Sequence, residues 1–231
     1  MVDAATRILV VGGSPEPSSA ETIRCAAAGC KAVVAVDRGL DALLAAGVSC
    51  DLFCGDADSV SEHGAELVRL CERDVSGNAA GAADAPRFEV VRYNPHKDDT
   101  DLGLALGEIA CRWPGASLVG TCLSGGHPDH ALAVLGRLST WDGGVEVIED
   151  GFVQRILKRG DAWELHGHTG ARFTFVPLSL SATVSERKMR WNLDHKRVSL
   201  LSDLGVSNVV EAESASITCH EGIISAWVFE R

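Results

Sequence analysis

The chain has 231 residues, 46% of them hydrophobic and 23% charged, which is ordinary for a globular protein of one large or two modest domains. Its formal net charge of −11 comes without a basic stripe, so nucleic acid and anionic membrane surfaces are disfavoured as partners. Apolar runs such as Ile8–Val11 are far shorter than the roughly 18–20 residues of a membrane span. The N-terminal residues lack the long apolar region of a secretory signal. We therefore expect a soluble, cytoplasmic protein.

Eight cysteines raise the question of a disulfide scaffold or a metal site. No two of them form a Cys-x-x-Cys pair, which argues against a zinc ribbon and a thioredoxin-type redox motif. Most of them lie inside apolar runs, where free cysteine behaves as a small hydrophobic residue. We expect all eight to be reduced and to pack in the interior.

The first 150 residues alternate short apolar runs with segments of helical periodicity. The predicted strands are Arg7–Val11, Ala32–Val36, Asp51–Cys54, Phe88–Tyr93, Ser117–Thr121 and Val145–Ile148. The predicted helices are Glu21–Ala28, a short helix around Leu40–Leu44 that ends at Gly47, Glu62–Arg73, a helix around Leu102–Ile109, and Pro128–Trp141. Ser76–Pro86, rich in Gly, Ala, Asn and Asp, is predicted to be a mobile loop. This alternation predicts a parallel sheet flanked by helices.

The pattern changes after about Asp150, where short β-type runs are separated by Gly, Asp and Ser turns. These runs are Phe152–Leu157, Ala162–His166, Arg172–Pro177, Ala182–Val184 and Ile223–Phe229. They predict an antiparallel sandwich over residues 151–231, following an α/β domain over residues 1–150. A sandwich of this size has little core of its own, so we expect it to pack on the first domain or on a second subunit.

Acidic residues follow several of the predicted strands or open the next helix. Asp37, Asp56 and Asp58 follow strands, whereas Asp101 and Asp129 stand at helix starts. In an open α/β sheet these loops meet at one rim, where ligands bind. Any single Asp is more often a helix cap or a turn residue. Together, carboxylates on one rim favour a cation, and Mg²⁺ is the hard cation that binds carboxylates and phosphates at once.

The Asp56-Ala57-Asp58 motif is weak when taken alone. Spacing of two on extended backbone places both carboxylates on one side. Phosphoaspartate phosphatases also use Asp-x-Asp, but usually after the first strand. Nucleotide-sugar glycosyltransferases remain open on this motif alone.

Two helix starts carry groups suited to phosphate. Lys97-Asp98-Asp99-Thr100-Asp101 reads equally well as a capping box or as a phosphate site with Lys97 as a point charge. Gly125-Gly126-His127-Pro128-Asp129-His130 follows a strand, and its glycines allow a ligand to approach the backbone. His127 and His130 alone are not a convincing metal pair. Gly12-Gly13-Ser14 is a generic phosphate-loop candidate that lacks the Rossmann and Walker patterns.

Taken in order, these segments resemble the thiamine pyrophosphokinase family. The segments that carry the resemblance are Asp37-Arg38-Gly39, Gly55-Asp56-Ala57-Asp58-Ser59, Lys97-Asp98-Asp99-Thr100-Asp101, Gly125-Gly126-His127-Pro128-Asp129-His130 and Gly205-Val206-Ser207-Asn208. The resemblance covers essentially the whole chain. No single motif is decisive, but five in the family's order are strong.

The resemblance implies an α/β nucleotide-binding domain, a β-sandwich that helps to hold thiamine, and a homodimer. The implied reaction converts ATP and thiamine to AMP and thiamine diphosphate. It implies catalytic roles for Asp56, Asp58, Asp101 and Asp129, with Mg²⁺ on the first three. The implied nucleotide-binding residues are Asp37, Arg38, Lys97, Asp98, Thr100, Gly125, Gly126 and His130. Ser207, Asn208 and Trp191 are implied on the thiamine side, although Trp191 is predicted more readily as a packing residue of the sandwich.

Three positions depart from the family pattern. Arg38 stands in place of a glycine, Ala57 in place of a Phe, and His127-Pro128 in place of a pair that contains Arg. Two alternatives therefore stay open: a pyrophosphokinase that acts on a pterin alcohol, and a thiamine-binding protein without activity. The Ser207-Asn208 turn and the β-rich C-terminal region favour thiamine over the pterin. Either Asp101 or Asp129 is a candidate for the base that accepts the hydroxyl proton.

Overall fold

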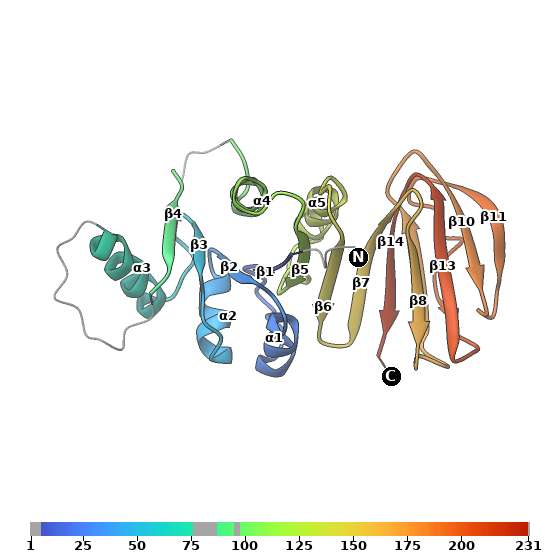
Figure 1. Ribbon diagram of the computed structural model, residues 1–231, viewed down its shortest axis with the longest axis horizontal. Helices are drawn as coiled ribbons and strands as arrows, with labels where there is room; N and C mark the ends of the chain where they lie inside the picture. The colour runs from blue at the N-terminus through green and yellow to red at the C-terminus, as the bar shows by residue number, and fades with distance from the viewer. Residues whose placement is uncertain (1–5, 76–86, 95–97, 231) are drawn as a thin grey trace. The chain divides into compact units, whose positions relative to one another are not determined.

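The chain folds into two compact units in a computed structural model that describes residues 6–75, 87–94 and 98–230 (Figure 1). The first unit comprises Met1–Arg137 with Ile148–Asp150, and the second comprises Leu138–Val147 with Gly151–Arg231. The chain passes between them along β6 (Val145–Glu149). The loop predicted at Ser76–Pro86 lies outside the described residues.

The first unit is built on a parallel sheet in the order β5-β1-β2-β3-β4. Its strands are β1 (Arg7–Val11), β2 (Ala32–Val36), β3 (Leu52–Gly55), β4 (Glu89–Arg92) and β5 (Ser117–Thr121). The first four strands add in one direction, whereas β5 returns to the other side of β1. This reversal makes a switch point between β1 and β5, which is where open α/β sheets bind ligands.

Helices cover both faces of this sheet. They are α1 (Ala20–Ala27), α2 (Gly39–Ala46), α3 (Glu62–Val75), α4 (Asp101–Arg112) and α5 (Pro128–Ser139). Figure 1 shows α1 and α2 on one face and α4 and α5 on the other. All five residues of β2 are buried, as expected for a strand covered on both sides. A β-carbon at Gly39 would lie 2.0 Å from the carbonyl oxygen of Val11, so only glycine lets α2 begin this close to β1.

The second unit contains two groups of antiparallel strands. One group runs β12-β9-β14-β7 and the other β11-β10-β13-β8. The strands are β7 (Phe152–Lys158), β8 (Ala162–His166), β9 (Arg172–Pro177), β10 (Ser181–Arg187), β11 (Leu193–Ser199), β12 (Asn208–Val209), β13 (Ser214–Glu221) and β14 (Ile223–Phe229). Their alternate side chains, among them Phe173, Phe175 and Ile217, form one apolar core.

The mixed α/β architecture, with a parallel sheet followed by antiparallel strands, confirms the predicted fold class. Every strand and helix that the sequence predicts within the described residues is present, with ends that move by a few residues; the last helix ends at Ser139 instead of Trp141. Three strands were not predicted. β11 contains Asp194, His195, Lys196 and Arg197 and is mostly exposed, and β12 has only two residues. β13 alternates buried and partly buried residues, a pattern that was readable.

One further expectation is corrected. All eight cysteines are free, but Cys25 and Cys111 are exposed and do not pack in the interior. None of the helices in the described part of the chain is long and apolar enough to cross a membrane.

Candidate active site

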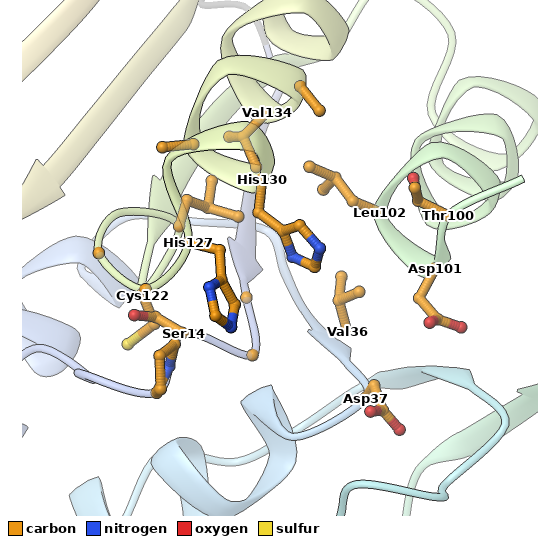
Figure 2. A pocket seen from close by; sticks show the side chains of 18 of the residues that line it. Ser14, Val36, Asp37, Thr100, Asp101, Leu102, Cys122, His127, His130 and Val134 are labelled. Atoms are coloured by element: carbon orange, nitrogen blue, oxygen red, sulfur yellow. The ribbon is translucent and has the colours of Figure 1, made fainter.

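A cavity of about 520 Å³ opens in the first unit at the carboxyl ends of β1, β2 and β5. Its size falls within the range of about 300–1,000 Å³ that is typical of small-molecule sites. Gly12–Pro15 follow β1 and line one side, and Cys122, Leu123 and Gly125–His127 follow β5 beside them. Thr100, Asp101 and Leu102 line the wall that α4 contributes, as Figure 2 shows. The cavity therefore lies at the switch point between β1 and β5.

Three carboxylates converge at one edge of this cavity. Asp37, Asp56 and Asp58 each offer an oxygen, and these oxygens lie within 4.8 Å of one another. Asp37 follows β2 and lines the cavity, whereas Asp56 and Asp58 follow β3. Asp56 is buried, and its Oδ1 accepts a hydrogen bond of 3.2 Å from the backbone N–H of Asp58. The predicted clustering of acidic residues at the strand ends is therefore present in the structure.

Asp37 shows the electrostatic cost of this grouping. Its Oδ2 accepts a hydrogen bond from the Ser59 hydroxyl, while Oδ1 is buried without a hydrogen-bond partner among the described residues. Burial raises the pKa of Asp37, and repulsion from the Asp101, Asp58 and Asp56 carboxylates raises it further. A divalent cation would relieve both, and hard oxygen ligands are the set that Mg²⁺ prefers. Asp37, Asp56 and Asp58 therefore fit as ligands of a magnesium ion. Asp101 is not in this group, but its charge acts on Asp37.

The N-terminus of α4 forms the wall next to these carboxylates. The Thr100 hydroxyl caps the helix by accepting a hydrogen bond of 3.1 Å from the Gly103 N–H. Asp99 accepts a hydrogen bond from the Thr100 N–H and pairs with Arg137. Asp98 is exposed and is not among the described residues that line the cavity. Lys97 lies outside the described residues.

The N-terminus of α5 forms the opposite wall. Gly125 and Gly126 have φ of 92° and 71°, and a β-carbon at Gly126 would lie 3.0 Å from the Pro15 ring. The rings of His127 and His130 lie 6.0 Å apart, and Figure 2 shows them across the cavity from Thr100 and Asp101. Both helix N-termini carry partial positive charge, which favours an anion between them.

Besides Asp98, the predicted site residues Asp129 and Arg38 are not among the described residues that line the cavity. Asp129 is exposed on α5 and does not line it. Arg38 is also exposed, and its Nε donates a hydrogen bond of 3.2 Å to the Ser59 carbonyl. Arg38 thus fixes the loop after β3, which carries Asp56 and Asp58.

Sequence reasoning missed a basic residue of the cavity, Arg137. This side chain lines the cavity on α5, and the residues His130, Val134 and Arg137 at positions i, i+4 and i+7 share a helix face. That periodicity was the available signal. The His127-Pro128 pair at the start of α5 lacks the Arg that the family has there. Arg137, later on the same helix, supplies a guanidinium to the cavity.

The three residues predicted on the thiamine side lie in the second unit. Trp191 is 59% exposed, so packing in the sandwich core, the role preferred from the sequence, is wrong. The Asn208 side chain is buried: its Oδ1 accepts from the Trp191 N–H at 3.2 Å, and its Nδ2 donates to the Trp191 carbonyl at 2.8 Å. Ser207 has φ of 62°, and its N–H donates to Thr174. Asn208 therefore holds the turn that presents Trp191.

Burial also perturbs an acidic group behind this turn. Glu186 is 1% exposed, and its Oε2 accepts a hydrogen bond of 3.2 Å from Asn208. Burial raises the pKa of Glu186 to about 7. The turn with Trp191 thus rests on a carboxyl group that titrates near neutral pH.

A cavity with grouped carboxylates and two helix N-termini is suited to the transfer of phosphate groups. Residues 25–148 match the family model described as thiamin pyrophosphokinase, catalytic domain. Residues 163–224 match the thiamin pyrophosphokinase vitamin B1 binding domain. The first match alone spans more than half of the chain. The chain belongs to the thiamin pyrophosphokinase family, and it is an enzyme with the thiamine diphosphokinase activity of that family.

Solved structures of the family share this fold. The thiamine pyrophosphokinase from Bacillus subtilis superimposes with a TM-score of 0.74 at 21% identity, covering 98% of this chain and 100% of the other. The Geobacillus thermodenitrificans enzyme gives a TM-score of 0.74 at 22% identity, with 98% of each chain covered. The Candida albicans enzyme gives 0.76 at 13% identity, covering 98% of this chain and 90% of the other. Among curated proteins, no sequence matches the chain.

Proposed function

We propose that the cavity of the first unit binds ATP and that the pyrophosphoryl group passes there to the hydroxyl of thiamine. The observation that carries this assignment is the convergence of Asp37, Asp56 and Asp58 beside a cavity with two helix N-termini. The carboxylates would hold Mg²⁺, which supplies charge neutralisation for the triphosphate. Residues 1–150 would thus form the ATP-binding domain and residues 151–231 the thiamine-binding domain.

The cavity offers separate surroundings for the two ends of ATP. The N-terminus of α4 at Thr100, together with Gly125 and Gly126, would receive the phosphates through backbone N–H groups. From α5, the Arg137 guanidinium would add positive charge and the His130 ring would offer a hydrogen bond. Leu102 and Val134 line the same cavity and offer apolar surface to the adenine ring.

The reaction forms a bond between the thiamine oxygen and the β-phosphorus and breaks the bond from that phosphorus to the α-phosphate oxygen, so that AMP leaves. The hydroxyl proton must pass to a base. Of the two candidates from the sequence, Asp101 lines the cavity and Asp129 does not, so we assign this role to Asp101. Because the transition state is loose, positioning and charge neutralisation account for most of the catalysis.

The thiamine side of the proposal rests on Trp191 and Ser207. An exposed indole offers a flat apolar face for the pyrimidine ring and attracts the cationic thiazolium. The net charge of −11 favours approach of a cation from solution. We place the enzyme in the cytoplasm as a homodimer that binds neither nucleic acid nor membrane.

An assay of AMP release tests this function. Thiamine as acceptor should give AMP and thiamine diphosphate in equal amounts, whereas a pterin alcohol or no acceptor should give neither. EDTA should abolish turnover and added Mg²⁺ restore it. Turnover with the pterin alcohol, or thiamine binding without AMP release, would instead support one of the two alternatives left open by the sequence.

A further inference from the structure

Glu149, the last residue of β6, is buried behind the cavity and is not part of any motif in the sequence. Its carboxylate accepts hydrogen bonds from three successive backbone N–H groups that follow β5: Cys122 at 2.9 Å, Leu123 at 2.8 Å and Ser124 at 3.1 Å. The Ser18 hydroxyl donates a fourth bond of 2.5 Å. Glu149 as a whole is 7% exposed, and it belongs to the first unit.

Three successive N–H groups that converge on one point form an anion-binding concavity of the kind that holds phosphate in other proteins. Cys122 has φ of 55°, a left-handed conformation that is strained for a residue with a side chain and that needs support from its surroundings. Here the anion in the concavity is a carboxylate of the chain itself. The Glu149 carboxylate therefore both stabilises the strained turn and takes up N–H groups that a phosphate would otherwise bind.

The contacts of Glu149 extend to the second loop of the cavity. The loop after β1 leads from Ser14 to Ser18, whose hydroxyl binds Glu149 and accepts from the Asp150 N–H at 3.2 Å. Near the cavity, the Ser14 hydroxyl donates a bond of 2.5 Å to the Ser124 carbonyl, and the Ser14 N–H donates to the Cys122 carbonyl at 3.1 Å. The two loops that flank the switch point are thus fixed to each other around one buried carboxylate.

We infer that Glu149 is a positioning residue for nucleotide binding. By holding residues 122–124, it sets the place of Gly125 and Gly126 and the start of α5, and so directs the phosphates to the remaining N–H groups. It does not touch the reacting atoms. This inference rests on the proposed function, because it requires that ATP occupies this cavity.

Glu149→Gln tests the inference with a nearly isosteric change. In the carboxylate, Oε1 accepts from the Leu123 and Ser124 N–H groups, and Oε2 accepts from the Cys122 N–H, the Ser18 hydroxyl and, at 3.5 Å, the Thr121 hydroxyl. An amide in either orientation turns its NH₂ group against at least one backbone N–H, which leaves a buried donor unsatisfied. We expect the Kd for a non-hydrolysable ATP analogue with Mg²⁺ to rise by about tenfold to a hundredfold. The KM for thiamine should change by less than about twofold, a split that general loss of structure does not produce.

Two further variants make the test independent of folding. Ser18→Ala removes no charge and two hydrogen bonds, the one to Glu149 and the one from the Asp150 N–H, so it should fold and should weaken analogue binding in the same direction by a smaller factor. Glu146→Gln is the control on the same strand: Glu146 pairs with Arg155, and this change should leave analogue binding at the wild-type value. Circular dichroism fixes a temperature at which all the variants compared are folded.

The outcomes separate this inference from the proposed function. Wild-type analogue affinity in folded Glu149→Gln, or an equal loss of nucleotide and thiamine affinity, overturns the positioning role alone. If Glu149→Gln does not fold, unchanged analogue affinity in Ser18→Ala overturns it. A wild-type protein that binds no ATP analogue overturns the proposed nucleotide site, and the positioning role with it.

Discussion

Asp56 and Asp58 follow β3 at the rim of the sheet and are not part of the apolar core. Their charge can therefore be removed without changing the packing of the core. Asp56→Asn or Asp58→Asn should lower kcat by about 10²–10³-fold, the usual cost of losing one electrostatic stabiliser at a reacting phosphate. Mg²⁺ binding by calorimetry should weaken in parallel, while the thermal midpoint should stay at or above that of the wild type, because repulsion within the group decreases. Asp142→Asn, an exposed aspartate of the second unit, is the control. Full turnover of Asp56→Asn in EDTA would exclude the metal role.

Glu186 predicts a pH dependence of stability. The unfolded chain loses the Glu186 proton near the usual pKa of 4.5, whereas the folded chain keeps it up to about 7. Between these values the folded state binds more protons, so stability falls as pH rises and levels off above about 7. The loss amounts to about 1.4 kcal/mol per pH unit across that window. Urea unfolding at pH 5 and pH 8 should show it in the wild type.

The matching variant is Glu186→Gln, which keeps an acceptor for Asn208 and cannot ionise. The difference in unfolding free energy between pH 5 and pH 8 should be smaller than in the wild type by this contribution. An unchanged difference would mean that Glu186 is ionised throughout and that another group compensates its charge.

Trp191 separates substrate binding from stability. Because its indole is 59% exposed, Trp191→Leu should leave the thermal midpoint near the wild-type value. Loss of stacking on thiamine should weaken thiamine affinity by about 1–2 kcal/mol, or roughly tenfold. Trp163→Leu is the counterpart, because Trp163 is 5% exposed and lies in the core. This substitution should lower the thermal midpoint without changing thiamine affinity in the folded protein. Unchanged thiamine affinity in Trp191→Leu would exclude the stacking role.

For single residues, the sequence predicted which side chains of the same type lie together better than it predicted individual hydrogen bonds. Asp37, Asp56 and Asp58 were expected together because strand ends of a parallel sheet meet at one rim. Glu149 was not found, because its role depends on the turn at Cys122, which no local pattern encodes. Arg137 lies outside all five quoted motifs, and the only sequence signal for it is the helix face that it shares with His130.

Among the elements, α4 connects local helix stability with the site. Thr100→Ala removes the hydroxyl that caps the helix, which should cost about 1 kcal/mol of stability. Because the first turn of α4 lines the cavity, fraying there should also raise the KM for ATP. Thr100→Ser keeps the capping oxygen and should restore both. A changed midpoint with an unchanged KM would show that this helix end does not bind the nucleotide.

Whether a strand could be predicted depended on how clearly its own residues differ from those of a loop. β1 and β2 were predicted with their observed ends because buried parallel strands are continuous apolar runs. β11 was missed because an exposed edge strand carries charged residues, which also suit a loop. The apolar run of β14 is used within the chain: β14 pairs with both β7 and β9, and its alternate residues Ile224, Ala226 and Val228 lie in the core of the second unit.

For the molecule as a whole, another surface is the better candidate for self-association. Besides Trp191, the described part of the second unit exposes five large aliphatic side chains, from 45% to 86%: Leu180, Leu200, Leu201, Leu204 and Val206. Two backbone hydrogen bonds join their segments, from the Leu200 N–H to the Leu180 carbonyl and from the Leu201 N–H to the Pro177 carbonyl. Leu180, Leu200 and Leu201 therefore lie on adjacent segments, and exposed apolar residues that lie together mark interaction surfaces. A homodimer would cover them.

Light scattering with size-exclusion chromatography tests this assembly. The wild type should elute as a dimer at micromolar concentration, and Leu201→Asp should shift it to the monomer, because a charge buried in an apolar interface stays unpaired. Leu132→Asp is the matched control: Leu132 on α5 is 56% exposed, as is Leu201, and the variant should remain dimeric. If both variants dimerise like the wild type, the interface lies elsewhere on the chain. A wild-type monomer with full activity would exclude the dimer, because a complete site would then exist within one chain.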